Sequence, residues 1–418
     1  MINYEKYILD NGLRVIFHKD KTTPLITVNL LYGVGAKHEN ENKTGFAHLF
    51  EHLMFSGSRN VPSYDEVIDK IGGENNAFTN NDYTNYYLTI PANQLETALW
   101  VESDRMKYLN INQKSLDVQK NVVIEEFKQR YLNQPYGDIW MLLRELSYKT
   151  HPYRWSTIGK EISHIENATL EDVVEFYNKF YMPNNAILCI GGDFESDYAL
   201  ELCKKWFEEI PKGEITQINI PKEPLQTQAR ELKVYRDVPQ NVIYISFPMA
   251  SRLEKEYYAF DLLSDLLSNG RSSRLYNSLI KEKGLFTEIN AFISGDIDNG
   301  LFILSGRYSQ GVEIQKGEEA IWKELEKIKS DNIDDYEFQK VKNKFESTYT
   351  LSQIKTLERA MNLCYFEYLG EIDLINKEVD NYSALEKEFI QSLAKDTFIK
   401  EKSNTLYYLT EKEISLDE

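Results

Sequence analysis

The 418-residue sequence has few of the residues that mark fibrous, disordered or disulfide-bonded proteins. It contains 20 glycines and 11 prolines, too few for collagen or a low-complexity chain. Its three cysteines are odd in number and lack CxxC spacing, which excludes a disulfide scaffold and fits buried thiols in a reducing compartment. No run of 18 apolar residues occurs, so the sequence predicts no membrane-spanning helix.

Positive charge is also scarce. The chain has 48 basic and 66 acidic residues, a net charge of −18, and no tight cluster of Lys and Arg. Such a chain repels phosphate backbones and anionic lipid, which argues against nucleic-acid and membrane partners. The N-terminus, MINYEKYILD, is charged where a secretory signal is apolar. We therefore expect a cytoplasmic protein, or a periplasmic one only if a signal peptide was removed.

The length suits two domains, and one segment resembles a linker. Three of the prolines, with polar spacers, fall between Pro211 and Pro224. The sequence therefore predicts one domain over 1–215 and a second over 216–418, joined by a linker at about 211–224. Near the N-terminus, alternating apolar residues flank Asp10-Asn11-Gly12 and predict a β-hairpin with a type I′ turn.

The second half repeats the pattern of the first. The segment GFAHLFEHLMFSGS is echoed by YAFDLLSDLLSNGRS, and NATLEDVVEFYNKFYMPNNAILCI by YSALEKEFIQSLAKDTFIKEKSNTLYYL. These matches predict an α+β fold of two homologous domains, each an antiparallel sheet packed with helices on one side. The alternative is a coincidence between amphipathic helices.

The most informative motif for chemistry is GFAHLFEHLMF. His48, Glu51 and His52 stand at i, i+3 and i+4, so a helix places all three on one face. Two imidazoles one turn apart suit Zn²⁺, and a neighbouring carboxylate can take a proton from a zinc-bound water. A helix with two surface histidines is the plain alternative, but two of only six histidines fall in this motif. A third ligand is required, and spacing alone does not choose it.

The motif HLFEH, followed by Glu126 in NVVIEEF, resembles the insulinase/pitrilysin family of zinc metallopeptidases, in its half-length mitochondrial-processing-peptidase-like branch. Similar matches occur in GGENNAFTNNDYTNYYLTIP and HPYRWSTIGKEISHI. The resemblance implies zinc ligands His48, His52 and Glu126 and a general base, Glu51. Glu125 is the alternative third ligand, and a solvated helix face is the plain reading of both glutamates.

Two further positions follow from the resemblance. The family has a second carboxylate seven residues before its glutamate ligand, where this sequence has Gln119, which can support the site by hydrogen bonding but supplies no charge. The resemblance also implies that Asn76, Ala77 and Phe78 form a substrate-binding strand that pairs with an extended peptide. The alternative is an ordinary sheet edge kept soluble by polar neighbours.

The family completes its active site with an Arg and a Tyr from a second-half domain. The matching segment, LIKEKGLFT, has Ile280 and Thr287 at those positions, and neither can donate to an oxyanion. Arg274 and Tyr276 lie upstream at the wrong spacing. The resemblance therefore implies a zinc-bearing subunit of a heterodimer, whose sibling lacks HxxEH and carries the Arg/Tyr pair. A homodimer and an alignment slip are the alternatives.

Together these features predict a zinc-dependent endopeptidase subunit that cleaves unfolded peptides through a zinc-bound water activated by Glu51. Two other functions stay open. One is a non-catalytic structural subunit of the same family, favoured by the substitutions at Gln119, Ile280 and Thr287. The other is a subunit that captures peptides at Asn76–Phe78 without cleaving them.

Overall fold

A computed structural model describes residues 1–214 and 218–411 of the chain. It divides into two compact units, each assembled from three segments. The first unit comprises Met1–Lys128, Trp155–Ile220 and Thr350–Glu378, and the second comprises Gln129–Arg154, Pro221–Tyr349 and Val379–Glu418. Part of the predicted linker, residues 215–217, lies outside the described residues. Within the part of the chain that is described, no helix is long and apolar enough to cross a membrane.

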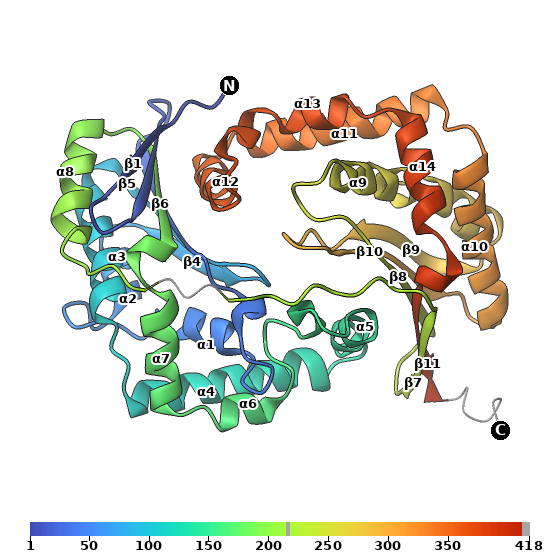
Figure 1. Cartoon of the computed structure of the whole chain (residues 1–418), viewed down its shortest axis with the longest axis horizontal. Coiled ribbons are helices and arrows are strands. Elements are labelled where there is room, and N and C mark those ends of the chain that lie inside the picture. The colour runs from blue at the N-terminus through green and yellow to red at the C-terminus, as the bar shows by residue number, and fades with distance from the viewer. Residues whose placement is uncertain (215–217, 412–418) are drawn as a thin grey trace. The chain divides into compact units, whose positions relative to one another are not determined.

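The first unit is built on a six-stranded sheet with the order β1-β2-β6-β3-β5-β4. All neighbouring strands are antiparallel except β2 and β6, which run parallel. The strands are β1 (Glu5–Ile8), β2 (Arg14–Lys19), β3 (Leu25–Tyr32), β4 (Glu74–Thr79), β5 (Thr84–Pro91) and β6 (Ala186–Gly192). Strand β4 therefore lies at one edge of this sheet (Figure 1).

Most helices of the first unit come from the first half of the chain. They are α1 (Phe46–Leu53), α2 (Tyr64–Lys70), α3 (Leu95–Tyr108), α4 (Gln113–Phe127), α6 (Ile162–Glu166), α7 (Leu170–Phe180) and α8 (Ser196–Phe207). An aromatic group fixes α1 against the sheet: Phe50 stacks on Tyr181 at 5.0 Å, and Tyr181 contacts Tyr32 of β3 at 4.8 Å between ring centroids.

The opposite face of this sheet is covered by a helix from the second half, α12 (Thr356–Tyr368) (Figure 1). Side chains alternate between the two faces of a strand, so Leu31 and Cys189 lie on the face away from Tyr32. They pack with Leu363 and Cys364 of α12 in one buried cluster. The first unit is therefore completed by a segment that follows most of the second unit in sequence.

The second unit repeats the same topology in a five-stranded sheet with the order β7-β11-β8-β10-β9. Its strands are β7 (Arg230–Arg236), β8 (Val242–Pro248), β9 (Phe286–Ile293), β10 (Leu301–Tyr308) and β11 (Asn404–Thr410). One face of this sheet is buried by three helices, α9 (Lys255–Ser268), α10 (Ile314–Ser330) and α14 (Lys387–Thr397). Two further helices, α11 (Asp335–Ser352) and α13 (Glu378–Ser383), contribute side chains to the same core. The predicted α+β fold of two related domains is confirmed.

The other face of the second sheet is covered by α5 (Ile139–Ser147), which comes from the first half of the chain. Ile139 and Leu143 pack on Val242 and Leu406, and the Ser147 and Ser246 hydroxyls lie 2.7 Å apart. Each sheet thus receives one covering helix from the other half of the sequence.

The predicted hairpin at the N-terminus is present, but the prediction of a type I′ turn was wrong. Strands β1 and β2 pair with Ile8 opposite Arg14, and Gly12 has a positive φ of 87°. Asn11 does not have the positive φ that a type I′ turn requires. Its side chain is instead buried and donates to the carbonyls of Phe207 and Ile210 at 2.7 and 3.0 Å. These long-range bonds fix the conformation of the turn.

Candidate metal centre

Helix α1 carries the predicted motif, and its sequence explains its orientation. Five apolar side chains of the helix are buried: Phe46, Ala47, Leu49, Phe50 and Leu53. His48 and His52 lie on the other side, with 12% and 25% of their side chains exposed. The two rings are 4.8 Å apart between centroids. Burial of the apolar stripe therefore presents both imidazoles on one face, as their spacing predicted.

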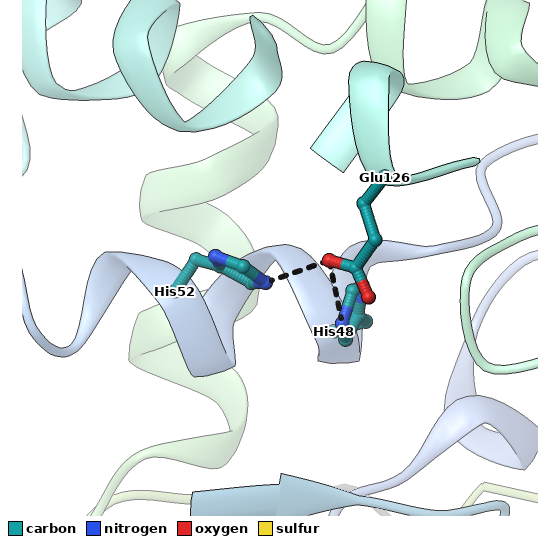
Figure 2. A group of neighbouring side chains, drawn as sticks. All are labelled: His48, His52 and Glu126. Carbon is teal, nitrogen blue, oxygen red and sulfur yellow. Dashed lines mark ion pairs between the residues drawn. The ribbon is translucent and has the colours of Figure 1, made fainter. Parts of the chain in front are cut away.

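Glu126 reaches this face from the neighbouring helix α4. Its Oε2 lies 3.7 Å from His48 Nε2 and 3.4 Å from His52 Nε2. Figure 2 shows the carboxylate of Glu126 pointing at both imidazoles. Helix α4 is fixed at its start by reciprocal bonds of 3.0 Å between Asn112 and Ser115, which form a capping box.

These three side chains fit a zinc ion. Ligand atoms at about 2.1 Å from tetrahedral zinc are separated from one another by roughly 3.4 Å. The measured separations of Glu126 from the two histidines are 3.4 and 3.7 Å, and the three donor atoms lie within 4.8 Å of one another. Two histidines and one glutamate are a typical ligand set of catalytic zinc. Among the described residues, these three side chains have ligand atoms close enough together to hold a metal ion.

Glu125, the alternative third ligand, lies elsewhere. Its carboxylate accepts from Lys128 Nζ at 2.7 Å, and 61% of its side chain is exposed. The structure therefore brings Glu126 to the histidines and leaves Glu125 on the solvated face of α4.

Glu51 lies beside the two histidines and is half-buried. Burial raises the pKa of Glu51 above its ordinary value, and the negative charge of Glu126 acts in the same direction. Hydrogen bonds from the hydroxyl and the backbone N–H of Thr79, together with His52, lower the same pKa. A carboxyl group whose pKa is raised towards neutrality is suited to accept and return a proton. Thr79, the last residue of β4, was not predicted to contact this group.

Gln119 lies on α4 seven residues before Glu126. Its Nε2 donates to Ser56 Oγ at 3.2 Å, beyond the end of α1. This bond ties the two helices together near the site. Gln119 therefore bonds the segment that follows α1 and adds no charge next to the ligands.

Strand β4, with Asn76, Ala77 and Phe78, has an open edge. Its inner side pairs with β5, while its outer side pairs with no strand of the described residues. The backbone N–H of Ala77 donates to Asn76 Oδ1 at 2.8 Å, and that of Thr79 bonds Glu51. Alternate backbone groups of one strand point to the same side, so both N–H groups point away from β5. The open edge therefore ends at the Glu51 carboxylate.

The second unit has no cationic or phenolic side chain at the two positions taken from the family resemblance. Ile280 lies in the π-helical turn Tyr276–Glu282 and packs against the core of the second unit. Thr287, at the start of β9, donates to the Arg307 carbonyl at 3.3 Å. Arg274 is held by two bonds of 2.9 Å to Glu337.

Comparison with known proteins places the chain in a family. The family model described as "Insulinase (Peptidase family M16)" matches residues 14–157, and the model described as "Peptidase M16 inactive domain" matches residues 167–345. The zinc protease PqqE of Helicobacter pylori is 30% identical over 379 residues, which cover 89% of this chain and 84% of the relative. The chain therefore belongs to the insulinase family, peptidase family M16, and the resemblance found in the sequence is confirmed.

Two other similarities extend over most of the chain. The mitochondrial-processing peptidase subunit beta of Saccharomyces cerevisiae is 24% identical over 362 residues, covering 82% of this chain and 77% of the relative. A crystal structure of a protease from Helicobacter pylori is 28% identical with a TM-score of 0.92, covering 98% of this chain and 100% of the other. These relatives match both halves of the chain.

Proposed function

We propose that this chain is a zinc-dependent endopeptidase subunit that hydrolyses unfolded peptides. The observation that carries the proposal is the convergence of His48, His52 and Glu126, with the Glu51 carboxylate beside them. The two histidines and Glu126 would hold the ion. Zinc in such a site polarises a carbonyl and lowers the pKa of water, which is the chemistry that peptide hydrolysis requires.

Glu51 is the residue that moves protons in this proposal. As a carboxylate it accepts a proton from the attacking water and then returns it to the leaving amine. Its half-buried position raises its pKa, which makes its carboxylate a better proton acceptor than that of an exposed glutamate. The bonds from Thr79 hold the carboxylate at the end of the open strand edge.

Strand β4 is the proposed docking site for the peptide. An extended peptide can pair with Asn76, Ala77 and Phe78 through its backbone, so pairing itself requires no particular sequence. Because the open edge ends at Glu51, a peptide paired along it is led towards the histidines. A substrate must be extended and free of other strand partners to pair in this way, so the substrates are expected to be unfolded.

We infer that a sibling subunit completes the site. Ile280 and Thr287 leave the second unit without the donors that the family resemblance implies. The yeast relative is named as a subunit, which supports a heterodimer whose partner lacks HxxEH and supplies an Arg and a Tyr. A homodimer would have two zinc sites and no such pair, and should turn over slowly. The cytoplasmic location stays a prediction from the N-terminal sequence.

A non-catalytic subunit of the same family is the second candidate. Gln119, Ile280 and Thr287 all depart from the catalytic pattern, and residues 167–345 match a model named for an inactive domain. Such a subunit would bind zinc and peptide without cleavage, whatever its partner.

The test is hydrolysis of a quenched, unstructured peptide of about 15–30 residues by the purified, zinc-loaded chain. The chain alone is measured first, and then with a sibling that carries the Arg/Tyr pair. Zinc-dependent cleavage that disappears in Glu51→Gln supports the enzyme. Zinc binding without cleavage under every pairing would leave the non-catalytic subunit.

A further inference from the structure

Helix α1 begins at a residue that cannot cap it. Its N-cap is Gly45, with a left-handed φ of 89° and no side chain to accept from the first-turn amides. A Cβ at this position would meet the carbonyl oxygen of Ile158 at 2.7 Å, so a capping Ser or Asp does not fit. The first-turn N–H groups of the helix that carries His48 must therefore find acceptors elsewhere.

Glu39 supplies these acceptors from outside the helix. Its Oε2 accepts from the N–H of Gly45 at 2.9 Å, and its Oε1 accepts from the N–H of Ala47 at 2.8 Å. The backbone N–H of Phe46 also bonds this carboxyl group. Only 8% of Glu39 is exposed. Burial raises the pKa of Glu39 to about 8, so its two oxygens hold the first turn through hydrogen bonds rather than through a full negative charge at neutral pH.

We propose that Glu39 is a positioning residue of the zinc site, which fixes the first turn of α1 and thereby the His48 imidazole. This inference rests on the proposed function. Ala47, whose N–H is bonded to Glu39, directly precedes His48. Helix α1 has only eight residues, and helices this short are marginal unless their ends are held.

A second set of contacts fixes the segment before the helix without contacting α1. The Trp155 indole N–H donates to the carbonyl of Ala36 at 3.0 Å, just before Glu39. The Thr44 hydroxyl accepts from the Lys160 N–H at 2.7 Å and lies 2.8 Å from His164 Nδ1. These contacts fix residues 36–44. The Glu39 side chain belongs to this segment and bonds the first turn of α1, so it holds the turn to the fixed segment.

If Glu39 positions the zinc site, its removal should change zinc binding as well as stability. A displaced first turn moves His48 relative to Glu126, 3.7 Å away, while His52 is one turn further on. Zinc affinity and ligand geometry should then change. A residue needed only for folding would lower stability and leave both properties of the folded protein intact.

The experiment measures metal binding by the full-length chain. Zinc affinity is determined by competition with a chelator, and the visible spectrum of the Co²⁺-substituted protein reports ligand geometry. Glu39→Ala is expected to weaken zinc binding about 10–100-fold and to alter the Co²⁺ spectrum, as loss of supporting groups does at other metal sites. Glu39→Gln retains one amide oxygen as acceptor, fills the same volume and should recover part of the affinity.

The matched control is Thr169→Ala. It removes the N-cap of α7, where the Thr169 hydroxyl accepts from the Asp172 N–H, and so destabilises another helix of the same unit. We expect wild-type affinity and an unchanged Co²⁺ spectrum for this variant. If Glu39→Ala does not fold, Glu39→Gln alone must still show weaker binding and an altered spectrum.

Two results would overturn the inference alone: wild-type affinity and spectrum in folded Glu39 variants, or an equal loss in Thr169→Ala. Failure of the wild-type chain to bind zinc would instead overturn the proposed function, and the positioning of the zinc site with it.

Discussion

The two units share one sheet topology but differ in the side chains of one helix. In chain order, β2 to β6 of the first unit correspond to β7 to β11 of the second, and both sheets place the corresponding strands in the same order. Helix α1 packs on edge strand β4, and α9 packs on edge strand β9. Even the edge strands agree in sequence, ENNAFT over Glu74–Thr79 and EINAFI over Glu288–Ile293.

The chemistry of the two helices is different. When Gly57 is aligned with Gly270, the second unit has Asp261, Ser264 and Asp265 in place of His48, Glu51 and His52. Asp261 accepts from the Tyr382 hydroxyl at 2.7 Å. Asp265 faces the ammonium groups of Lys340 and Lys344. Asp265 also accepts a hydrogen bond from the Asn269 amide at the end of α9, so both carboxylates have partners within the second unit.

The edge strands also differ in what their outer sides bind. In the second unit, the Ser268 hydroxyl bonds both the N–H and the carbonyl of Ala291, at 2.7 and 2.9 Å. In the first unit, the Ala77 N–H bonds only its neighbour Asn76 in the recorded contacts. A helix therefore occupies the strand edge of the second unit at the position where the edge of β4 is open in the first unit. The comparison teaches that the duplicated fold provides a helix and a strand edge, and that a few side chains decide their use.

The largest effect is expected from replacing Glu51, and it contrasts with the effect of replacing its counterpart Ser264 in the second unit. Glu51→Gln should keep zinc and lose about 10³-fold in peptide hydrolysis, because the amide cannot accept the proton of the attacking water. Ser264→Ala should leave hydrolysis unchanged, since this hydroxyl bonds only the Asp261 carbonyl in the recorded contacts. Hydrolysis rates and bound zinc are measured for both. Full activity in zinc-loaded Glu51→Gln would remove Glu51 from the mechanism.

The next largest effect is a difference in zinc binding between variants of the two adjacent glutamates of α4. Glu126→Gln should weaken zinc binding by more than about 100-fold, because a ligand is lost rather than a supporting group. Glu125→Gln should bind zinc as the wild type does, since Glu125 contacts only Lys128 in the recorded contacts. Chelator competition measures both variants. Full zinc occupancy in Glu126→Gln would point to another third ligand.

Much of the site could be predicted because its key residues lie close together in sequence. The spacing of His48, Glu51 and His52 places them on one helix face whatever the rest of the fold does. The position of Glu126 could not be obtained from spacing, and it came from the family resemblance. In the structure Glu126 faces the histidines while Glu125 faces solvent.

The features that the sequence did not reveal depend on contacts between distant segments. No local pattern shows that α12 covers the sheet of the first unit, or that Cys189 and Cys364 are buried in one cluster there. Glu39 lies in a polar segment with no periodicity, and only the folded chain brings it to α1. The turn type at Asn11 was predicted wrongly for the same reason, because the conformation of the turn is set by bonds to Phe207 and Ile210.

A smaller effect is expected from introducing a carboxylate at position 119, beside the proposed zinc site. Gln119→Glu should raise zinc affinity by up to about 10-fold, since a carboxylate favours the positive ion more than an amide does. Gln119→Ala, which removes the bond to Ser56, should lower the affinity. Chelator competition separates the two. Equal affinity in all three proteins would show that position 119 has no influence on the metal.

The smallest effect concerns Asp265, the counterpart of His52. Burial raises the pKa of Asp265 above its ordinary value of 3.8, although Asn269 and the two lysines lower it. The folded protein therefore binds this proton more tightly than the unfolded chain does. Above pH 3.8 the unfolded state releases the proton first, so the contribution of Asp265 to the free energy of unfolding falls as the pH rises.

This contribution is isolated by comparing the wild type with Asp265→Asn in urea denaturation between about pH 4 and 7. The free energy of unfolding of the wild type should fall relative to that of the variant over this range. Lys344→Met should steepen the loss, because removing the ammonium group raises the pKa of Asp265 further. A difference that stays constant or grows in favour of the wild type would mean that the lysines outweigh burial. In that case the acidic helix of the second unit would be held mainly by ion pairing, in sharper contrast to the histidine-bearing helix of the first.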